Sequence, residues 1–415
     1  MKRILQIIIL LLIAFGSLSA QSPKRDVRAV WITTAWGQSM DWPSVTVPAT
    51  GTETQREKAR ETQKTGLDNI LNTLQMANFN TVYFQVRGMC DAFYKSKYEP
   101  WSQYISSTRG ADPGWDPLEY AVTEAHARGM ELHAWINPYR YSSAGDSHGN
   151  LDSDYAKTNP DWLLDYGSSK KILNPGISDV RKRICDVVED IITNYNVDGI
   201  VFDDYFYMSG TTNAMDQKQF DAYNPSNLSR GDWRRENVNQ MVRDVQTRIN
   251  SKKPYLTFGI SPAGVAASDA TVAAKYGVDR CPSGTDWQYN SIYSSPLAWI
   301  TENTIDYISP QIYWSTTSTN NNYRLISAWW AKVTNQFGRH FFSSNTSHID
   351  TNNRFLTSEM LSQLRLLRDA DLNGIAGAVH FRYASYLVST FYAFKEDLYQ
   401  FPALTAIYAW KPAPM

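Results

Sequence analysis

Short apolar segments alternate with longer amphipathic ones along most of the chain. The short segments are rich in Val, Ile, Phe, Tyr and Trp, the residue types that favour β-strands. Eight of them lie at residues 26–36, 80–87, 130–137, 200–202, 255–260, 306–314, 339–344 and 374–381. Between them apolar residues recur at helical spacing, for example Leu67, Ile70, Leu71 and Leu74. The pattern predicts strands and helices in regular alternation.

The boundaries of several helices can be predicted from local signals. Asp116 and Pro117 are an N-cap residue and a first-turn proline, and Gly129 ends the helix that they begin. Polar composition predicts long loops at residues 38–65 and 141–176. Further helices are predicted near residues 178–195, 232–250, 323–337, 357–370 and 387–399.

Eight strands that alternate with helices predict an α/β fold, a single (β/α)8 TIM barrel over residues 25–405. Long loops follow each of the first four strands, the two at 38–65 and 141–176 and two more after the second and fourth strands. All of them would therefore lie on the C-terminal face of the strands. A doubly wound sheet is the alternative, and it would favour a glycine-rich phosphate loop after the first strand. Residues 34–37 read Thr-Ala-Trp-Gly there, without that motif, so the barrel is preferred.

Residues 1–20 have the pattern of a secretory signal peptide. Lys2 and Arg3 precede an apolar core at residues 4–15, and small residues follow at 16–20. The core is shorter than the roughly 20 residues that span a bilayer, so we expect cleavage and no stable membrane span in the mature chain. Retention as an uncleaved anchor is the alternative. The expected location is the periplasm or cell envelope.

Composition excludes several classes of partner and cofactor. The formal net charge is -1, which argues against nucleic acid or an anionic membrane surface as a partner. The three cysteines are widely spaced and form no disulfide framework, and the six histidines include no zinc motif. We therefore expect no metal and no cofactor. The 14 Trp and 25 Tyr residues suit stacking on sugar rings, although many secreted proteins share this abundance.

Two adjacent carboxylates, Asp203 and Asp204, directly follow the apolar run at residues 200–202. Charges are costly inside a buried strand, so we expect the pair to open into a cleft at the strand's C-terminal end. Alternation along the strand places Val201, Asp203 and Tyr205 on one face, which favours Asp203 at the centre. A bend would let both carboxylates reach in. In the simpler interpretation one Asp caps the loop and the other is solvated.

Cleavage of a glycosidic bond needs a proton donor and a second group that stabilises a cationic sugar centre. Repulsion between the two carboxylates would hold one of them protonated near neutral pH. Ser261 lacks the context of a nucleophile elbow, and no phosphate cradle is present. Trp135 and Trp287 are further candidates for sugar stacking, although each Trp is more often a core residue. We predict catalysis by Asp203 and Asp204 and contacts to a glycan partner from Arg87, Asn137, Tyr139, Tyr205, Gln311, Tyr313, Trp314, Trp36, Asn345 and His380.

Seven stretches resemble the glycosyl-hydrolase-like 10 family of bacterial envelope proteins. They are residues 28–32 (RAVWI), 80–87 (NTVYFQVR), 98–102 (YEPWS), 125–140 (AHARGMELHAWINPYR), 173–176 (LNPG), 198–207 (DGIVFDDYFY) and 309–314 (SPQIYW). The resemblance covers nearly the whole mature chain. It implies a (β/α)8 glycoside hydrolase that cleaves peptidoglycan glycan strands after the stem peptides have been removed.

Residues 198–205 also look like a distant variant of the chitinase motif Asp-x-x-Asp-x-Asp-x-Glu. The third Asp of the motif falls on Asp203, but Tyr205 stands where the catalytic Glu would be. The acid would then come from Asp203, Asp204 or a loop residue, for which Asp91, Glu99 and Asp286 are unranked candidates. The departure favours one alternative, a catalytically silent glycan-binding barrel. A glycosidase acting on another polysaccharide is a further alternative.

Overall fold

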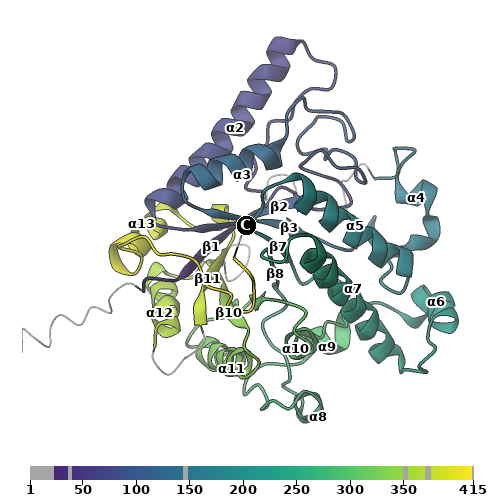
Figure 1. Cartoon of the computed structure of the whole chain (residues 1–415), viewed down its shortest axis with the longest axis vertical. Helices are drawn as coiled ribbons and strands as arrows, with labels where there is room; N and C mark the ends of the chain where they lie inside the picture. The colour runs from purple at the N-terminus through teal and green to yellow at the C-terminus, as the bar shows by residue number, and fades with distance from the viewer. Residues whose placement is uncertain (1–22, 36–39, 144–147, 349–353, 370–374, 414–415) are drawn as a thin grey trace, which may run out of the picture.

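The computed structural model describes residues 23–35, 40–143, 148–348, 354–369 and 375–413. Within them, eight parallel strands close into a barrel in the order β1-β11-β10-β9-β8-β7-β3-β2. The predicted (β/α)8 fold is therefore confirmed (Figure 1). The strands are β1 (Val27–Ile32), β2 (Thr81–Arg87), β3 (Glu131–Ile136), β7 (Gly199–Phe202), β8 (Thr257–Ile260), β9 (Tyr307–Ile308), β10 (His340–Thr346) and β11 (Ile375–Phe381).

Helices surround the barrel, and in Figure 1 they form a ring outside the strands. The predicted helix start at Asp116 is confirmed, because its carboxylate accepts hydrogen bonds from the N–H groups of Leu118 and Glu119. The helices that follow the strands are α2 (Glu53–Met76), α3 (Pro117–Ala127), α5 (Ser178–Asn194), α7 (Arg230–Lys252), α10 (Pro296–Thr301), α11 (Tyr323–Gln336), α12 (Thr357–Leu367) and α13 (Val388–Asp397).

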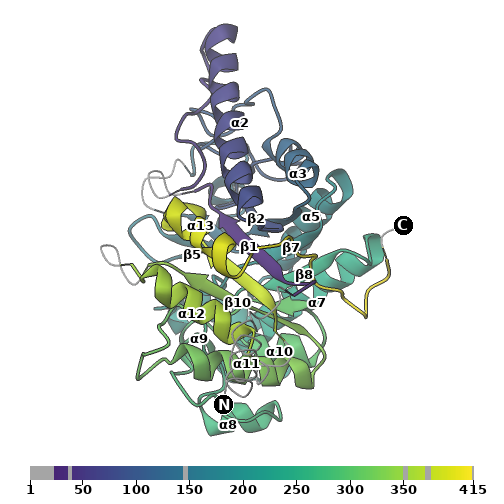
Figure 2. The ribbon, with the colours of Figure 1, turned by 90° about the vertical axis from the view of Figure 1, so that its left-hand side faces the viewer.

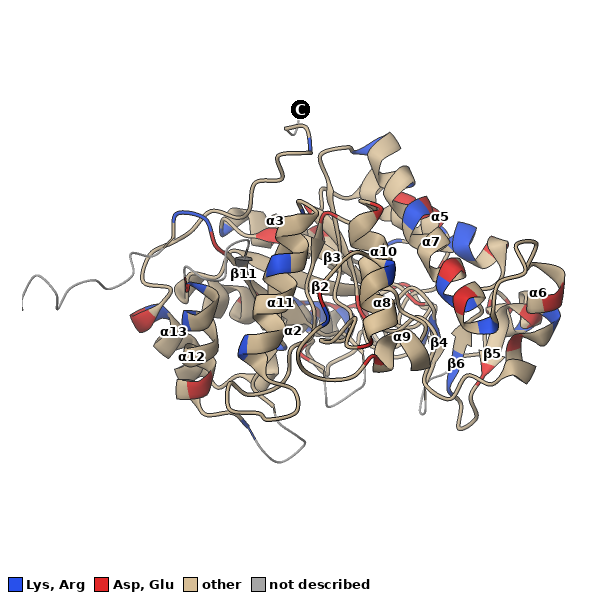
Figure 3. Cartoon of the chain, turned by 90° about the horizontal axis from the view of Figure 1, so that it is seen from below, with Lys and Arg blue, Asp and Glu red and all other residues tan. Residues whose placement is uncertain are grey.

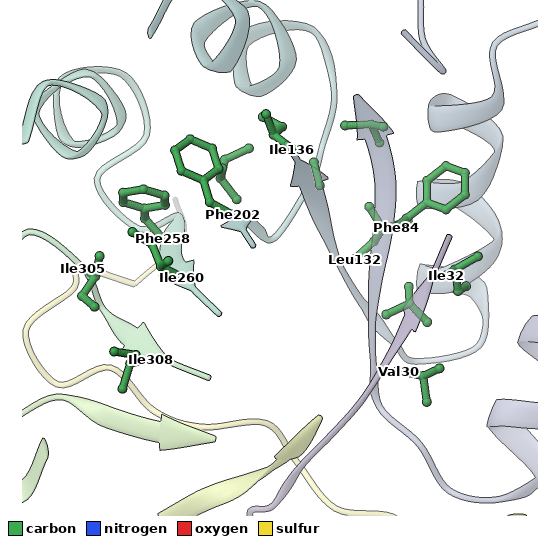
Figure 4. Close-up of a cluster of buried hydrophobic side chains, with 14 of the residues drawn as sticks. Val30, Ile32, Phe84, Leu132, Ile136, Phe202, Phe258, Ile260, Ile305 and Ile308 are labelled. Carbon is green, nitrogen blue, oxygen red and sulfur yellow. The ribbon is translucent and has the colours of Figure 1, made fainter. Parts of the chain in front are cut away.

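Alternate residues of each strand serve two cores. Val30, Phe84 and Phe202 belong to the layer between the strands and the helices, part of which Figure 4 shows. Trp31 and Val201 belong to the second core, inside the barrel. This alternation follows from the two-residue period of a strand. It fixes which side chains at each strand's end face the barrel axis.

The barrel interior is filled by large aromatic rings. Gly259 of β8 makes room for one of them, because a Cβ atom there would lie 2.1 Å from ring carbons of Tyr307. The C-terminal segment covers the N-terminal ends of the strands. Tyr408 packs against the interior core, and the Trp410 indole donates to Asp306 at 2.7 Å. The interior is therefore closed at this end.

Two predicted loops contain regular structure. Helix α2 begins at Glu53, inside the polar stretch 38–65, because Thr52 and Gln55 form a capping box. Its first turns carry charged and polar residues rather than an apolar stripe, and Figure 2 shows α2 extending away from the barrel. The loop predicted at 141–176 holds α4 and nearly all of a small three-stranded antiparallel sheet, whose first strand begins at Arg140. The elements are β4 (Arg140–Ser142), α4 (Tyr155–Thr158), β5 (Leu163–Asp165) and β6 (Lys171–Leu173).

The sixth predicted strand, at residues 306–314, is wrong in its length. Only Tyr307–Ile308 is regular strand, because Pro310 has no N–H to donate to a neighbouring strand. Beyond it, Gln311 still bridges to Ala263 and Ser344. The chain therefore leaves the barrel here in an irregular path that carries Gln311 and Tyr313.

Charged residues of both signs are interspersed over the outer helices. Figure 3 shows Lys and Arg next to Asp and Glu along α5 and α7. Lys252 of α7, for example, pairs with Glu189 of α5 at 2.7 Å. Within the described residues, no helix is both long and apolar enough to cross a bilayer.

Candidate active site

A pocket of about 280 Å³ opens at the carboxyl ends of the barrel strands. Strands β1, β3 and β11 contribute to it, together with the segments that follow β7 and β9 and the first residue of β4. This is the face on which (β/α)8 enzymes carry their active sites. The pocket is lined by Trp31, Trp135, Arg140, Asp203, Asp204, Tyr205, Gln311, Tyr313 and Phe381.

Both predicted catalytic carboxylates line this pocket. Val201 points into the barrel and Phe202 points to the helices, so strand alternation carries Asp203 inward. Strand β7 ends at Phe202, which frees Asp204 from that alternation. Asp203 is 5% exposed and Asp204 is 8% exposed. Both acids therefore line the pocket while being largely shielded from solvent.

Asp203 is held by two hydrogen-bond donors. The Asn137 side-chain amide donates to Oδ2, and the Tyr205 backbone N–H donates to Oδ1 at 3.4 Å. Burial and, to a smaller extent, the negative charge of Asp204 raise the pKa of Asp203 to about 7, against the opposing effect of the Arg140 guanidinium. Asp203 can therefore carry a proton near neutral pH.

Asp204 has a different environment. The Gln311 amide donates to Asp204 Oδ1 at 3.0 Å and to the Ser261 carbonyl at 3.1 Å. Burial raises the pKa of Asp204, while the bond from Gln311 favours its charged form. The charge on Asp204 raises the pKa of Asp203, which means that Asp204 ionises first. Asp204 is thus the charged member of the pair, and Asp203 is the member that carries the proton.

Tyr205 and Arg140 form the mouth of the pocket. The Arg140 guanidinium lies 4.6 Å from the centroid of the Tyr205 ring, within the range of a cation–π contact. Tyr205 is 44% exposed. The neighbouring charge of Asp204 raises the pKa of Tyr205 to about 12, so its hydroxyl keeps its proton at neutral pH. It can donate a hydrogen bond to a ligand that enters the pocket.

The remaining pocket wall is aromatic. Trp31 and Trp135 meet edge to face with their ring centroids 4.7 Å apart. Tyr313 stacks on Phe381 with a centroid separation of 5.9 Å. A wall of flat rings opposite polar groups suits a ligand such as a sugar, which has apolar C–H faces and a polar edge.

Comparison with known proteins decides the class. The sequence profile of the glycosyl hydrolase-like 10 family matches residues 26–354. The chain belongs to this family. Membership makes the protein a glycoside hydrolase and confirms the resemblance seen in the sequence motifs.

Individual relatives agree with this assignment. Glycosyl hydrolase YngK of Bacillus subtilis (strain 168) is 34% identical over 409 residues, which cover 94% of this chain and 75% of that protein. Glycosyl hydrolase DigH of Escherichia coli (strain K12) is 34% identical over 329 residues, 76% of this chain and 72% of that protein. The solved α-L-fucosidase isoenzyme 2 from Paenibacillus thiaminolyticus is 13% identical with a TM-score of 0.56, over 90% of this chain and 49% of that one. This chain therefore spans about half of the fucosidase, and the likeness shows the fold alone.

Five of the predicted site residues of this glycosyl hydrolase-like 10 protein line the pocket: Asp203, Asp204, Tyr205, Gln311 and Tyr313. Asn137 lies behind the pocket, against Asp203. Trp135, a further candidate for stacking, lines it as well. Trp36 lies outside the described residues.

The other predicted contacts lie away from the pocket. Arg87 is buried and pairs with Glu99 at 2.8 Å, because a register shift between Gln85 and Arg87 turns its side chain out of the barrel. Tyr139 is buried against Phe206. These two positions therefore hold the loops after β2 and β3 in place.

Three further candidates are also engaged elsewhere. Asn345 donates to the Tyr323 hydroxyl and to the Gln363 amide, on the outside of β10. His380 alternates with the inward Val379 and is buried, so that burial lowers the pKa of its imidazole to about 3. Trp314 is partly buried against the outer core. None of the three is among the residues that line the pocket.

The loop acids are accounted for by structural contacts. Glu99 pairs with Arg87, and Asp91 accepts a hydrogen bond from the Met89 backbone N–H. Asp286 accepts hydrogen bonds from the backbone N–H groups of Ser268 and Asp269. None of them lines the pocket. The described residues contain no cluster of His, Cys, Asp and Glu able to hold a metal ion. Asp203 and Asp204 are therefore the carboxylates available at this site.

Sequence reasoning gave no role to three residues that line the pocket: Trp31, Phe381 and Arg140. Strand alternation carries a signal for the first two. Trp31 follows Val27 and Ala29 on the inward face of β1, and Phe381 follows Val379 on that of β11. For Arg140 the signal is its position just after the third predicted strand, at the end of the barrel where the cleft was expected, although no role was assigned to it.

Proposed function

We propose that this protein is an exported glycosidase that cleaves N-acetylhexosamine-containing glycan, with peptide-free peptidoglycan strands as its substrate. The observation that carries the proposal is the pair of buried carboxylates, Asp203 and Asp204, in a pocket of about 280 Å³. The family assignment supplies the class of reaction. The signal-like residues 1–20 support export.

In this mechanism Asp203 is the general acid. Its raised pKa lets it hold a proton near neutral pH and donate it to the oxygen of the leaving sugar. Asp204 stays charged and stabilises the positive charge that develops at the anomeric centre. A water molecule then adds to that centre and gives up a proton, which restores the protonated Asp203. The Tyr205 hydroxyl and the aromatic wall orient the ring. Each step uses a residue that lines the pocket.

Arg140 supports a peptide-free substrate. Removing the stem peptide from peptidoglycan exposes the lactyl carboxylate of the muramic acid unit. Arg140 is the one Lys or Arg side chain among the described residues that line the pocket. Its guanidinium suits recognition of a carboxylate, which a glycan made only of N-acetylglucosamine lacks. Strands freed of peptide would therefore be cleaved faster than chitin oligomers of equal length.

The test measures soluble fragments released from purified, peptide-free sacculi. Asp203→Asn and Asp204→Asn, each shown to be folded, are expected to lower release by at least about 10²-fold, the usual size of an acid–base contribution. Asp221→Asn, at an exposed position of α6 (Gln217–Ala222), is the matched control and should keep wild-type activity. Full activity in both pocket variants would contradict the proposal.

Tyr205 favours a second candidate, a glycan-binding barrel without catalysis, because it stands where a chitinase-like motif has its catalytic Glu. The two functions separate in one assay. Retention of glycan strands without new reducing ends at high protein concentration would identify a binding protein. Reducing ends produced only from a different polysaccharide would instead identify another substrate.

A further inference from the structure

A chain of buried hydrogen bonds leads to Asp203 around the rim of the barrel. It begins at Thr34, two residues beyond the end of β1, and passes through Gln85 of β2 and Asn137, which directly follows β3. Asp203 follows β7, and these four strands are neighbours in the barrel. Each of the four residues is at most 5% exposed. Bulk solvent is therefore largely excluded from these hydrogen bonds.

The direction of this chain is fixed at its start. The backbone N–H of Thr34 can only donate, and it donates to Gln85 Oε1 at 2.8 Å. The other end of the Gln85 amide is then its NH2 group, which donates to Asn137 Oδ1 at 2.7 Å. The NH2 group of Asn137 is thereby left to donate to Asp203 Oδ2. An amide reversed at either position would set two donors or two acceptors against each other.

We propose that Gln85 and Asn137 are positioning residues for the proton on Asp203, forming a one-way amide relay that makes Oδ2 an acceptor. The proton is left on Oδ1, which receives only the weak bond from the Tyr205 backbone N–H at 3.4 Å. This rests on the proposed function, in which Asp203 is the general acid. Neither amide lines the pocket, so each acts through Asp203 rather than on the substrate. Asn137, expected from the sequence to contact the sugar, takes a supporting role instead.

The relay also sets how readily Asp203 ionises. A donor held on Oδ2 stabilises the carboxylate and so lowers the pKa of Asp203 against the effect of burial. The other groups that face Asp203 are Asp204 and Tyr205 beside it, Arg140 from β4 and Tyr313 after β9. All four stay unchanged when the relay is altered, so a shift in ionisation can be assigned to the relay.

Gln85→Glu is the variant that reverses the relay. A carboxylate at position 85 still accepts from the Thr34 N–H but cannot donate to Asn137. The Asn137 amide then turns its NH2 group to this new carboxylate and its oxygen to Asp203, which must be protonated to bond to it. We expect the pKa of Asp203 to rise by about one to two units, the effect of losing a hydrogen bond to a charged group.

Two readouts measure this shift. In the pH profile of kcat/KM on peptide-free glycan, the alkaline limb should move to higher pH by the same one to two units. The second readout is the ¹³C chemical shift of the Asp203 carboxyl during a pH titration, assigned by its loss in Asp203→Asn. It requires no turnover, so it tests the relay even if the protein hydrolyses no glycan. Hydrolysis itself is decided by the release assay.

Two further variants complete the test. Asn137→Leu removes the last donor without adding a charge and should shift the same limb and the same titration upward. Gln63→Glu is the matched control. Gln63 of α2 is equally buried, but it donates to the backbone carbonyls of Val45 and Ile105 and not to the relay. It should leave the Asp203 titration unchanged. If Gln85→Glu and Asn137→Leu lower activity at every pH with no shift in either readout, the relay is only structural and the inference is overturned.

Discussion

Replacing Asp203 by Asn should make the protein more stable at alkaline pH, although it removes the general acid. Burial holds the pKa of Asp203 at about 7 in the folded state, against 3.8 for an ordinary Asp. Below pH 3.8 the carboxyl is protonated in both the folded and the unfolded state, so its burial does not lower the free energy of unfolding. Between these two values the unfolded chain releases the proton and the folded protein keeps it. Stability is therefore lost as the pH rises, up to the folded-state pKa.

The magnitude follows from the size of the shift. A shift of about three units, at about 1.4 kcal/mol per unit, costs the folded state about 4 kcal/mol at pH 8. At pH 4 the same linkage costs less than about 1 kcal/mol. Asn has the shape of a protonated Asp, and its side-chain oxygen can still accept from Asn137. Asp203→Asn should therefore recover most of this free energy of unfolding at pH 8 and little of it at pH 4.

The assay is urea unfolding followed by tryptophan fluorescence, for wild type and Asp203→Asn, at several pH values between 4 and 8. The expected result is a difference in the free energy of unfolding that grows with pH in favour of the variant. Asp221→Asn removes an exposed carboxylate and should show no such growing gain. A variant that is no more stable than wild type at pH 8, or a difference independent of pH, would refute the reasoning about Asp203.

Two further predictions concern the barrel and the second carboxylate. Gly259→Ala places a methyl group 2.1 Å from the Tyr307 ring, and the overpacking should lower the free energy of unfolding by about 2 kcal/mol or more in the same urea assay. Gln311→Leu removes the donor to Asp204 Oδ1, so the pKa of Asp204 should rise. The acid limb of the kcat/KM profile should then move to higher pH by about one unit, and an unmoved limb would mean that Asp204 does not govern it.

The architecture could be predicted because it depends on patterns that are local in the sequence. Eight apolar segments separated by amphipathic ones specify a (β/α)8 barrel, and the structure has its eight parallel strands at those places. The errors lie where local chemistry departs from the pattern. Pro310 cut short the strand predicted at 306–314, and the capping box at Thr52 started α2 inside a stretch without an apolar stripe.

The candidate site was predictable in part for the same reason. Asp203 follows the inward Val201, and the structure shows that both carboxylates reach the pocket because β7 ends at Phe202. Arg87 was misplaced because the register shift in β2 is a matter of strand pairing, which one sequence does not show. His380 is on the outward face of β11, as its neighbour Val379 would have indicated. The amide relay depends on contacts between four strands and is visible only in three dimensions.

The role of Asp203 is tested most directly by substrates that differ only in their leaving group. A glycosyl fluoride of an N-acetylhexosamine oligomer needs little protonation to leave, whereas the natural sugar leaving group needs the proton that Asp203 supplies. The account predicts that Asp203→Asn cleaves the fluoride at a rate close to that of wild type while losing cleavage of the glycan, and that Asp204→Asn loses both. Equal losses on both substrates in Asp203→Asn would contradict its assignment as the general acid.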